Sequence, residues 1–428
     1  MKKTLLATGI ALSLMSFNAP VAFAKEAKAM SAQSVSSGID LNNLNKKVRA
    51  QDDFYRHMNG LWLESFEMPA DKSNYGAFTK LAEESREHVK AIINDVSKAL
   101  NSDGSAEQKI ADLYKTYMAT ETIESNGISA IQGELDKIQG LKNNKDLSEY
   151  MGYADIYNTA PLGMYVYIDQ KKSDEHIVYI GQSGLGMPDR DYYMKDDEKS
   201  QKIQKAYVEH IGNMLKLAGI KDSTKKAKGI FALEKELAAG QWTRIENRDS
   251  EKTYNKMTFD EFTAKVPAMN WDAWLTHTMI DKPAHIVVTQ PSYLDTLNKV
   301  LENTSMDAWK DYYTFHMISN AATSLSSEFD KENFAFFGTV LSGTTEQEPR
   351  WKRGVDLVNG IAGELVGAVY VKRHFPPEAK KRMVTMIKNL RTAYGDSIKE
   401  LPWMSEETKV KALDKLAKFD PKIGYPDV

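Results

Sequence analysis

The chain has 428 residues, of which 42% are hydrophobic and 27% charged, and its formal net charge is −3. This length permits a sizeable core and two or three domains, and the composition is ordinary for a globular protein. The near-neutral charge gives no basis for binding to nucleic acid or to an anionic membrane surface. Because the chain has no cysteine, disulfides, thiolate metal ligands, cysteine nucleophiles and a lipidated N-terminal cysteine are excluded.

The first 24 residues have the three parts of a cleavable secretory signal. Two lysines precede an apolar run, Leu5 to Phe17, and an A-x-A pattern ends at Ala24. The run is too short to remain as a membrane span. We therefore expect residues 1–24 to be removed, no stable membrane anchor to remain, and the protein to be exported by a bacterium to the periplasm or beyond. Residues 25–50, rich in Ser, Ala, Asn and Lys, are expected to form a flexible lead-in.

Aromatic residues become dense from Gln51 onwards, and here a folded domain is expected to begin. Asp52 and Asp53 could form a carboxylate pair for metal binding or acid–base chemistry. Acids just before a helix more often cap its free N–H groups, so we favour capping. His57 lies among apolar and aromatic residues and is interpreted as a hydrogen-bonded structural histidine rather than a ligand.

Apolar residues at three- and four-residue spacing predict a mainly α fold with a few short strands. The predicted helices cover residues 79–100, 106–122, 135–158, 200–217, 225–239, 259–266, 271–277, 293–302, 307–324, 329–341, 349–375, 378–399 and 406–418. The predicted strands cover residues 165–167, 176–181 and 285–289. There is no internal repeat and no heptad array.

The predicted helix 349–375 is the longest and is expected to be central. Pro349 suits a first helical turn, and a proline pair ends the helix after Phe375. Its apolar residues share one arc, while Gly360, Gly363 and Gly367 cluster on another side. Each glycine weakens a helix by roughly 1 kcal/mol relative to alanine. We therefore expect a second element to approach the glycines closely, the alternative being a solvent-facing side on which the glycines have no role.

Six motifs, in this order and at these spacings, resemble those of the neprilysin-like zinc metallopeptidases, peptidase family M13. They are D-D-F-Y at 52–55, N-G-L-W-L at 59–63, P-x-D-x-x-x-Y-G-x-F at 69–78, G-L-G-x-P-D-R-D-Y-Y at 184–193, R-D-x-x-x-x-Y-N at 248–255 and K-I-G-Y-P-D at 422–427. The resemblance covers essentially all of residues 51–428. It implies the N-terminal helical domain of the family, which caps the catalytic half and walls a substrate cavity.

The resemblance also implies a peptide substrate and, in the complete enzyme, a zinc ion. Some relatives place an arginine before the Tyr-Gly of the third motif, where it anchors a substrate carboxylate. That position is Asn74 here, and an amide cannot supply the charged fork of arginine. We therefore expect an endopeptidase without strong preference for a free C-terminus, with Asn74, Tyr75 and Phe78 as candidate residues of the cavity wall.

The catalytic motif of the family is missing from the sequence. Peptide hydrolysis in the family uses H-E-x-x-H, in which two histidines on one helix face hold zinc and the glutamate activates the bound water. No two of the eight histidines are four residues apart; His277 and His285 are the nearest pair, and His88 and His374 suit solvated positions. Ser183 lacks the second glycine that a nucleophile elbow requires, because Leu185 stands there.

We therefore expect this chain alone to be inactive, with no catalytic residue and no metal ligand of its own. The catalytic half would be supplied in cis or in trans. The alternative is an inactive relative that binds peptides or pairs with another chain. The two interpretations share a fold and differ in whether an H-E-x-x-H half accompanies this one.

Overall fold

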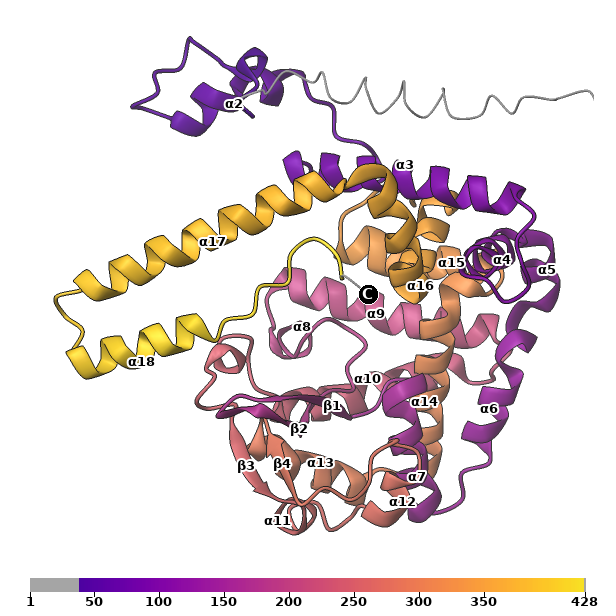
Figure 1. Cartoon of the computed structure of the whole chain (residues 1–428). Helices are drawn as coiled ribbons and strands as arrows, with labels where there is room; N and C mark the ends of the chain where they lie inside the picture. Colours follow the sequence, from indigo (N-terminus) through magenta and orange to yellow (C-terminus); the bar gives the residue numbers. More distant parts are fainter. Residues whose placement is uncertain (1–37, 427–428) are drawn as a thin grey trace, which may run out of the picture. The chain divides into compact units, whose positions relative to one another are not determined.

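The computed structural model describes residues 38–426 and divides the chain into two compact units, Met1–Met68 and Pro69–Val428 (Figure 1). We call their described parts the N-terminal unit, residues 38–68, and the main unit, residues 69–426. The predicted signal, residues 1–24, lies outside the described residues, as does half of the predicted lead-in, residues 25–37.

The N-terminal unit contains the short 3-10 helix η1 (Leu41–Asn43) and the α-helix α2 (Phe54–Ser65). The Asp53 side chain accepts a hydrogen bond from the N–H of Arg56 at 2.8 Å and so caps α2. His57 Nδ1 lies 2.6 Å from the carbonyl oxygen of Val48. Both structural interpretations, capping by Asp53 and a hydrogen-bonded His57, are confirmed.

Helices dominate the main unit, and the predicted mainly α fold class is confirmed (Figure 1). The helices of its first half are α3 (Ala77–Lys98), α4 (Ala106–Met118), α5 (Thr120–Asn126), η2 (Gly127–Ile131), α6 (Gln132–Gln139), α7 (Asn144–Tyr157), α8 (Asp191–Met194), α9 (Glu198–Leu217) and α10 (Ser223–Gly240). Those of its second half are η3 (Glu246–Arg248), α11 (Phe259–Thr263), α12 (Trp271–Leu275), α13 (Pro291–Asn303), α14 (Met306–Ala321), η4 (Ala322–Ser324), α15 (Ser327–Asn333), the π-helix η5 (Phe334–Leu341), α16 (Arg350–His374), α17 (Pro377–Glu400) and α18 (Glu406–Ala417).

Two of the predicted helices are interrupted. The segment 106–122 breaks between α4 and α5 at Ala119, whose backbone leaves the helical region with ψ of 64°. The segment 135–158 breaks into α6 and α7, because Asn143 takes an extended backbone and caps α7 through its side chain. Local propensity alone did not separate these pieces, since their apolar spacing continues across each break.

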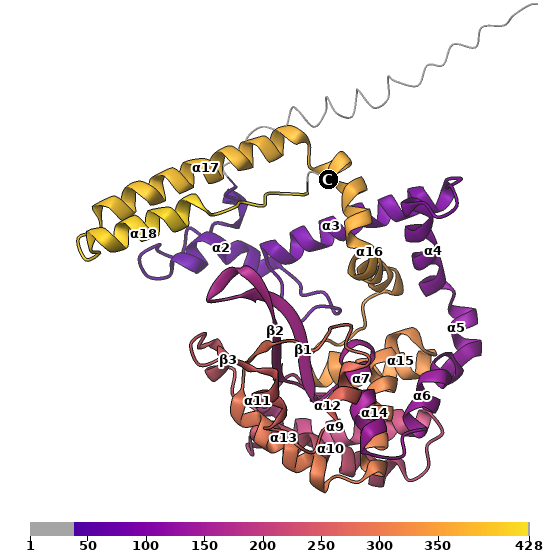
Figure 2. The ribbon, with the colours of Figure 1, turned by 60° about the horizontal axis from the view of Figure 1, so that its bottom comes forward.

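One four-stranded sheet lies against the helices, with strand order β1-β2-β4-β3. Its strands are β1 (Leu162–Asp169), β2 (Lys172–Gln182), β3 (Asn255–Thr258) and β4 (His285–Val288). The pair β1–β2 is a curved antiparallel hairpin (Figure 2), β2 runs parallel to β4, and β3 is antiparallel to β4. The short strand β3 was not predicted, because N-K-M-T has no apolar alternation. β1 is an edge strand.

The inner core of the main unit, our name for its largest cluster of buried side chains, joins one face of the sheet to α9, α10, α13 and α14. Helix α14 is buried on nearly every side, and the aromatic residues Trp309, Tyr312, Tyr313 and Phe315 along it are at most 1% exposed. A helix that is apolar all round belongs in a core. The central helix of this fold is therefore α14, and the prediction that the helix 349–375 is central is wrong.

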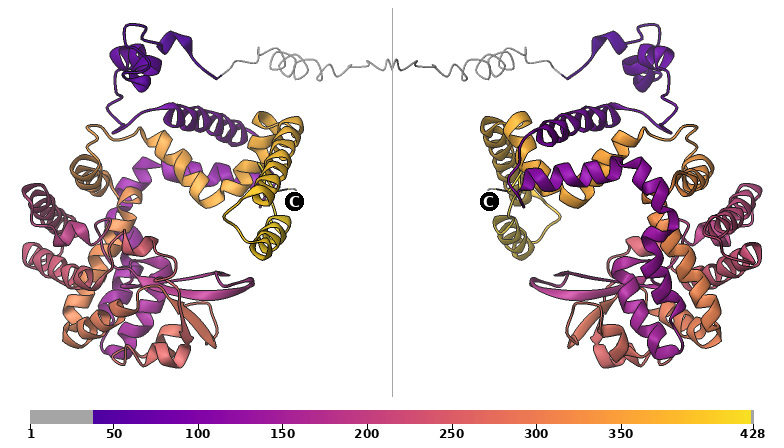
Figure 3. Two further views of the ribbon diagram at one scale, coloured as in Figure 1. Left: turned by 90° about the vertical axis from the view of Figure 1, so that its left-hand side faces the viewer. Right: turned by 90° about the vertical axis from the view of Figure 1, so that its right-hand side faces the viewer.

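Helix α16 confirms the predicted long helix, but it packs on one side. Val355, Val358 and Val366 are buried against α3 and α4, beside which α16 runs in Figure 3. A kink at Ala362, with φ −126° and ψ 27°, divides it. A β-carbon added at any of the three clustered glycines would meet no described atom within 4 Å, so the predicted close approach of a second element is not found in residues 38–426.

By length and composition α16 is the one described helix that could cross a membrane. Its most apolar window has a mean hydropathy of 1.3, and 22% of that window is buried. Length and composition do not distinguish a membrane segment from a helix covered by another part of a protein. The buried valines show that one face of α16 already packs within the main unit.

Helices α17 and α18 form a hairpin that extends from the end of α16 (Figure 1). Gly395 and Ile398 are the buried residues of α17, and α18 has none. Arg391 Nη2 donates to the carbonyl oxygen of Leu416 at 2.8 Å and ties the two helices together. We call α17 and α18 the helical arm.

Candidate functional site

The three candidate residues of the cavity wall lie at the start of α3. Asn74 precedes the helix and is exposed, Tyr75 is half-buried, and Phe78 in the first turn is 89% exposed. A phenyl ring that faces outward to this degree is available to a ligand or to a covering segment. Their role in a cavity wall remains a prediction, because a cavity also requires a facing segment that encloses it.

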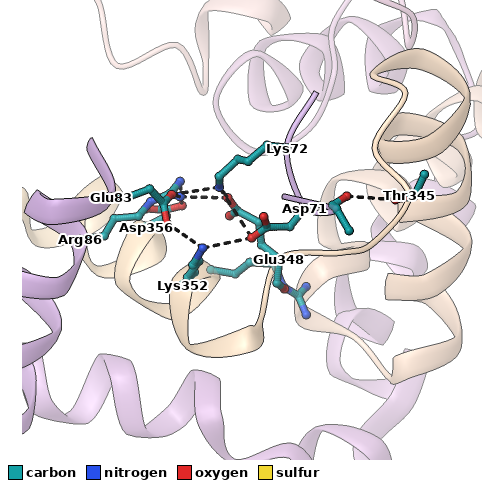
Figure 4. Close-up of polar contacts among 10 residues, drawn as sticks. Asp71, Lys72, Glu83, Arg86, Thr345, Glu348, Lys352 and Asp356 are labelled. Atoms are coloured by element: carbon teal, nitrogen blue, oxygen red, sulfur yellow. Dashed lines mark hydrogen bonds and ion pairs between the residues drawn. The ribbon is translucent and has the colours of Figure 1, made fainter. Parts of the chain in front are cut away.

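An ion-pair cluster fixes the segment just before these residues (Figure 4). It consists of Asp71, Lys72, Glu83, Arg86, Glu348, Lys352 and Asp356. Lys352 Nζ lies 3.1 Å from Asp71 Oδ2 and 2.7 Å from Glu83 Oε2. The Arg86 guanidinium donates to both carboxylate oxygens of Asp356, at 3.0 and 2.7 Å. The motif residue Asp71 is therefore bound to the first turn of α16.

Main-chain hydrogen bonds reinforce this connection. The carbonyl oxygen of Ala70 accepts hydrogen bonds from the N–H groups of Thr345 at 3.2 Å and Glu346 at 3.1 Å. Residues nearly 280 positions apart in the sequence, such as Lys72 and Glu348, are thereby held in contact. The third family motif thus has a structural role: it fastens the start of α3 to the start of α16.

The charges of the cluster stabilise one another. Partial burial disfavours the charge of Glu83, but hydrogen bonds from Lys352 and Lys72 outweigh that effect and lower its pKa to about 2. For Lys72 burial likewise opposes the charge, and hydrogen bonds to Glu348 and Glu83 prevail, so its pKa is raised. Side chains at 11–23% exposure are less screened than surface ion pairs, so this cluster contributes to stability.

The fourth family motif surrounds a buried carboxylate in the inner core. Tyr193 donates a hydrogen bond to Glu234 at 2.7 Å and accepts one from the N–H of Met187 at 2.9 Å. Tyr207 donates to Glu234 at 3.1 Å, and His316 Nε2 lies 2.8 Å from the same carboxylate. Burial and then the Glu234 charge raise the pKa of Tyr193 well above its usual value. Both tyrosines therefore stay protonated as donors to Glu234.

The glycines of this motif are required by close approach and by backbone conformation. A β-carbon at Gly186 would lie 1.9 Å from the Tyr207 hydroxyl. Gly184 has φ of +93°, a region that side-chain-bearing residues rarely adopt. These glycines therefore hold the motif in a rigid turn against Tyr207.

The fifth motif also makes structural contacts. Asp249 accepts hydrogen bonds from two N–H groups of the following turn and so orders this loop. Tyr254 donates to Asp169 at 2.7 Å, beside the ion pair of Asp169 with Lys256 at 2.8 Å. The contacts of Tyr254 and Lys256 with Asp169 join β3 and its approach to the end of β1.

The sixth motif folds back on the start of α17. Lys380 Nζ donates to the carbonyl oxygen of Tyr425 at 2.7 Å and lies 4.2 Å from the centre of its ring. The Tyr425 ring meets Phe375 edge-on at 5.8 Å. This contact closes one side of a surface hollow of about 860 Å³, which Gly363 and Gly367 of α16 also line. The hollow is open, so it is a groove rather than an enclosed cavity.

The described histidines do not converge on a zinc site. Within residues 38–426 no three side chains of His, Asp or Glu are placed to hold a metal ion. His88 and His374 stack face to face, with centroids 3.9 Å apart and planes 9° apart, so their ring planes run side by side rather than converge on one point. The residues therefore do not fit the zinc of H-E-x-x-H enzymes. The prediction that His88 and His374 occupy solvated positions is wrong: both are half-buried, and their rings stack on each other.

The sequence interpretation missed the ion-pair cluster. Its partners lie in two stretches of mixed charge, residues 71–86 and 348–356, and charges of both signs occur throughout the chain. The signal that could have pointed to it is Asp71, a motif residue followed directly by a lysine. Nothing local indicates that its partner begins α16.

The fold is thus a mainly α scaffold in which several motifs join distant segments, and comparison with known proteins identifies its class. Residues 50–426 match peptidase family M13, and the chain belongs to this family of zinc metallopeptidases. It is 26% identical over 416 residues to membrane metallo-endopeptidase-like 1 of Mus musculus, covering 90% of this chain and 54% of that protein. It is 28% identical over 398 residues to an endothelin-converting enzyme homolog of Locusta migratoria, covering 88% and 54%.

A solved structure gives the same result. The zinc metalloprotease ZMP1 of Mycobacterium tuberculosis, in complex with an inhibitor, superposes with a TM-score of 0.84 at 34% identity, over 90% of this chain and 59% of that one. The resemblance to an M13 N-terminal part is therefore confirmed. The chain spans about half the length of the two relatives above, 54% of each.

Proposed function

We propose that this chain is the capping part of a bacterial zinc metalloendopeptidase, which walls the substrate cavity while a second polypeptide segment supplies zinc and the H-E-x-x-H motif. That segment belongs to the same chain or to a partner chain. The substrate is a peptide, and the reaction is hydrolysis of its peptide bond. The observation that carries the proposal is the apolar surface of α16 and the helical arm.

This surface is formed by exposed apolar side chains, most of which are aliphatic or methionine side chains. Its exposed apolar side chains are Ile361 of α16, Met383, Val384, Met386, Leu390 and Tyr394 of α17, Trp403 between the arm helices and Val410 of α18. Monomeric soluble proteins rarely expose contiguous apolar patches of this kind, and such patches usually mark interfaces. The open glycines of α16 also permit close approach of a backbone. A covering segment therefore accounts for both features.

The experiment compares the chain with and without a catalytic half. Residues 25–428 are purified alone and co-expressed with an H-E-x-x-H half, taken from the adjoining reading frame or from ZMP1. Alone, the protein is expected to bind no stoichiometric zinc, to cleave no fluorogenic peptide and to bind a dye for exposed apolar surface. Together, the halves are expected to bind one zinc and to show chelator-sensitive hydrolysis. Hydrolysis by residues 25–428 alone, or a stable complex that remains inactive, would contradict the proposal; the latter would favour an inactive pairing module.

A variant pair tests the surface itself. Leu390→Glu places a charge in the apolar surface of α17 and is expected to abolish co-purification of the two halves. Thr392→Glu is the matched control, since Thr392 is exposed about 200° further round the same helix. Equal co-purification of the two variants would exclude this surface as the interface.

Asn74 carries the proposed substrate preference. With an amide rather than a guanidinium beside Tyr75 and Phe78, the assembled enzyme is expected to cleave amidated peptides and peptides with a free carboxylate equally well. Asn74→Arg is expected to raise kcat/KM for the free carboxylate, because arginine binds carboxylates through two charged hydrogen bonds. An unchanged ratio would remove Asn74 from the cavity wall.

Export is the remaining part of the proposal. The lysine pair, apolar run and A-x-A pattern of residues 1–24 support it. Sequencing of the mature N-terminus from a periplasmic extract is expected to begin at Lys25. An intact Met1 in the cytoplasm would contradict export.

A further inference from the structure

The free edge of strand β1 is a second, different unpartnered surface. Four consecutive residues, Tyr165 to Ile168, are between 39% and 59% exposed. Long exposed apolar edges invite pairing with another strand, and proteins usually cover or charge them. β1 pairs with β2 on one side, and the sheet ends there.

The register shows which main-chain groups face outward. Met164 pairs with Ile180, yet the Met164 N–H donates to the Asp155 carboxylate at 3.1 Å, and the Ile180 carbonyl accepts from Thr289 beyond β2. This pair is therefore not hydrogen-bonded across the hairpin. Residue pairs along an antiparallel hairpin alternate between hydrogen-bonded and non-hydrogen-bonded. The main-chain groups of Val166 and Ile168, which lie two and four residues after Met164, therefore also point away from β2.

These outward-facing groups form a short site, because the groups at its two ends already have hydrogen-bond partners. Asp155 satisfies Met164 at one end, and the Tyr179 hydroxyl donates to the Ile168 carbonyl oxygen at 3.1 Å at the other. Between them, the N–H and C=O of Val166 and the N–H of Ile168 have no partner among the described residues. Such a set of groups is complementary to the main chain of an extended peptide.

The side chains beside this edge differ from those of the helical arm. Tyr165 stacks on Tyr179, with centroids 5.2 Å apart and planes 6° apart, and Tyr167 follows on the same face. Tyrosine tolerates water through its hydroxyl group and still offers a large apolar face to a ligand. The aliphatic surface of α17 is suited to a stable interface, whereas this edge is suited to a ligand that binds reversibly.

We infer that the β1 edge binds an extended peptide as an added strand, through the main chain of Val166 and Ile168 with Tyr165 and Tyr167 against its side chains. The inference rests on the proposed function in that the bound peptide is the substrate of the assembled enzyme. Because this binding recognises the main chain of the peptide rather than particular side chains, the edge accepts peptides of many different sequences. The edge therefore positions the substrate and takes no part in the chemistry.

The test measures binding of a labelled probe to the full chain by fluorescence anisotropy. The probe is a short peptide of alternating threonine and valine flanked by lysines, and its control is the same peptide N-methylated on alternate residues. Val166→Pro removes the outward N–H, which edge strands tolerate because no hairpin bond is lost. Val166→Thr is the matched control and keeps that N–H. Val166→Pro and N-methylation are each expected to weaken binding about tenfold or more, and Val166→Thr is expected to leave it unchanged.

Equal binding of the plain and N-methylated probes by the wild-type chain would overturn the inference, even if Val166→Pro failed to fold. No binding of the plain probe would overturn it as well. Loss of probe binding on addition of the catalytic half would show that this half, not a peptide, occupies the edge. These outcomes are separate from failure of the proposed function, which is absence of zinc-dependent hydrolysis by the assembled halves.

Discussion

The inner core and the helical arm differ in how far their apolar side chains are buried. In the inner core, α14 is enclosed by its neighbours, and even a carboxylate, Glu234, is satisfied by Tyr193 and Tyr207. In the arm, two residues of α17 and none of α18 are buried, and aliphatic side chains face outward. The first region supplies its own stability, whereas the second has the composition of one side of an interface.

Glycine-to-alanine substitutions in the inner core and on α16 test this difference, and the one in the core has the largest expected effect on the free energy of unfolding. Gly186→Ala is expected to lower the free energy of unfolding by about 3 kcal/mol, because its β-carbon would overlap the buried Tyr207 hydroxyl and break the contact with Glu234. Gly367→Ala on α16 is the matched substitution and is expected to raise it by up to about 1 kcal/mol, since nothing described lies nearby. Urea unfolding followed by circular dichroism measures both, and equal effects would contradict the contrast.

A smaller effect is expected at the ion-pair cluster, which joins the start of α3 to the start of α16. Glu83→Gln is expected to cost about 2 kcal/mol near pH 7, because Lys72 and Lys352 each lose a charged partner. Folding lowers the Glu83 pKa from 4.5 to about 2, so its contribution is complete above pH 4.5 and is lost as the pH falls towards 2. Unfolding curves of the two proteins should converge over that interval. Glu84→Gln, at the exposed neighbouring position, serves as the control and should change little.

The smallest effect is expected at Asp155, where the core meets the β1 edge. Burial raises its pKa from 3.8 to about 6, against the opposing hydrogen bond from the Met164 N–H. The folded state therefore binds the proton more tightly, and wild-type stability should fall as the pH rises from 3.8 to 6. Asp155→Asn keeps an acceptor without the charge and is expected to be about 1 kcal/mol more stable above pH 6. A variant that is less stable at pH 7 would show that the charge itself is needed.

Sequence reasoning succeeded where the information was local. Capping by Asp53, the bounds of α9 and α10, and the start of α18 after Ser405 follow from neighbouring residues. The family motifs indicated the fold before any contact was known. For the candidate site, they proposed Asn74, Tyr75 and Phe78, whose role stays a prediction, and did not indicate the contacts that hold their segment in place.

The failures involve partners distant in sequence. The stacking of His88 on His374 and the pairing of Asp71 with Lys352 join segments more than 280 residues apart, and no periodicity records such contacts. Helix α16 was predicted to be central because it is apolar and rich in glycine. Those same features describe a helix with one face packed and the other uncovered.

The fastening of residues 70–72 to residues 345–352 has a consequence for synthesis. The first helix of the main unit cannot complete its native contacts until α16, one of its last, has left the ribosome. Contacts of such sequence separation raise the contact order and slow folding, and they leave α3 dependent on chaperones or on transient local structure in the meantime. A nascent chain stopped before residue 345 should therefore hold a folded centre and a protease-sensitive α3.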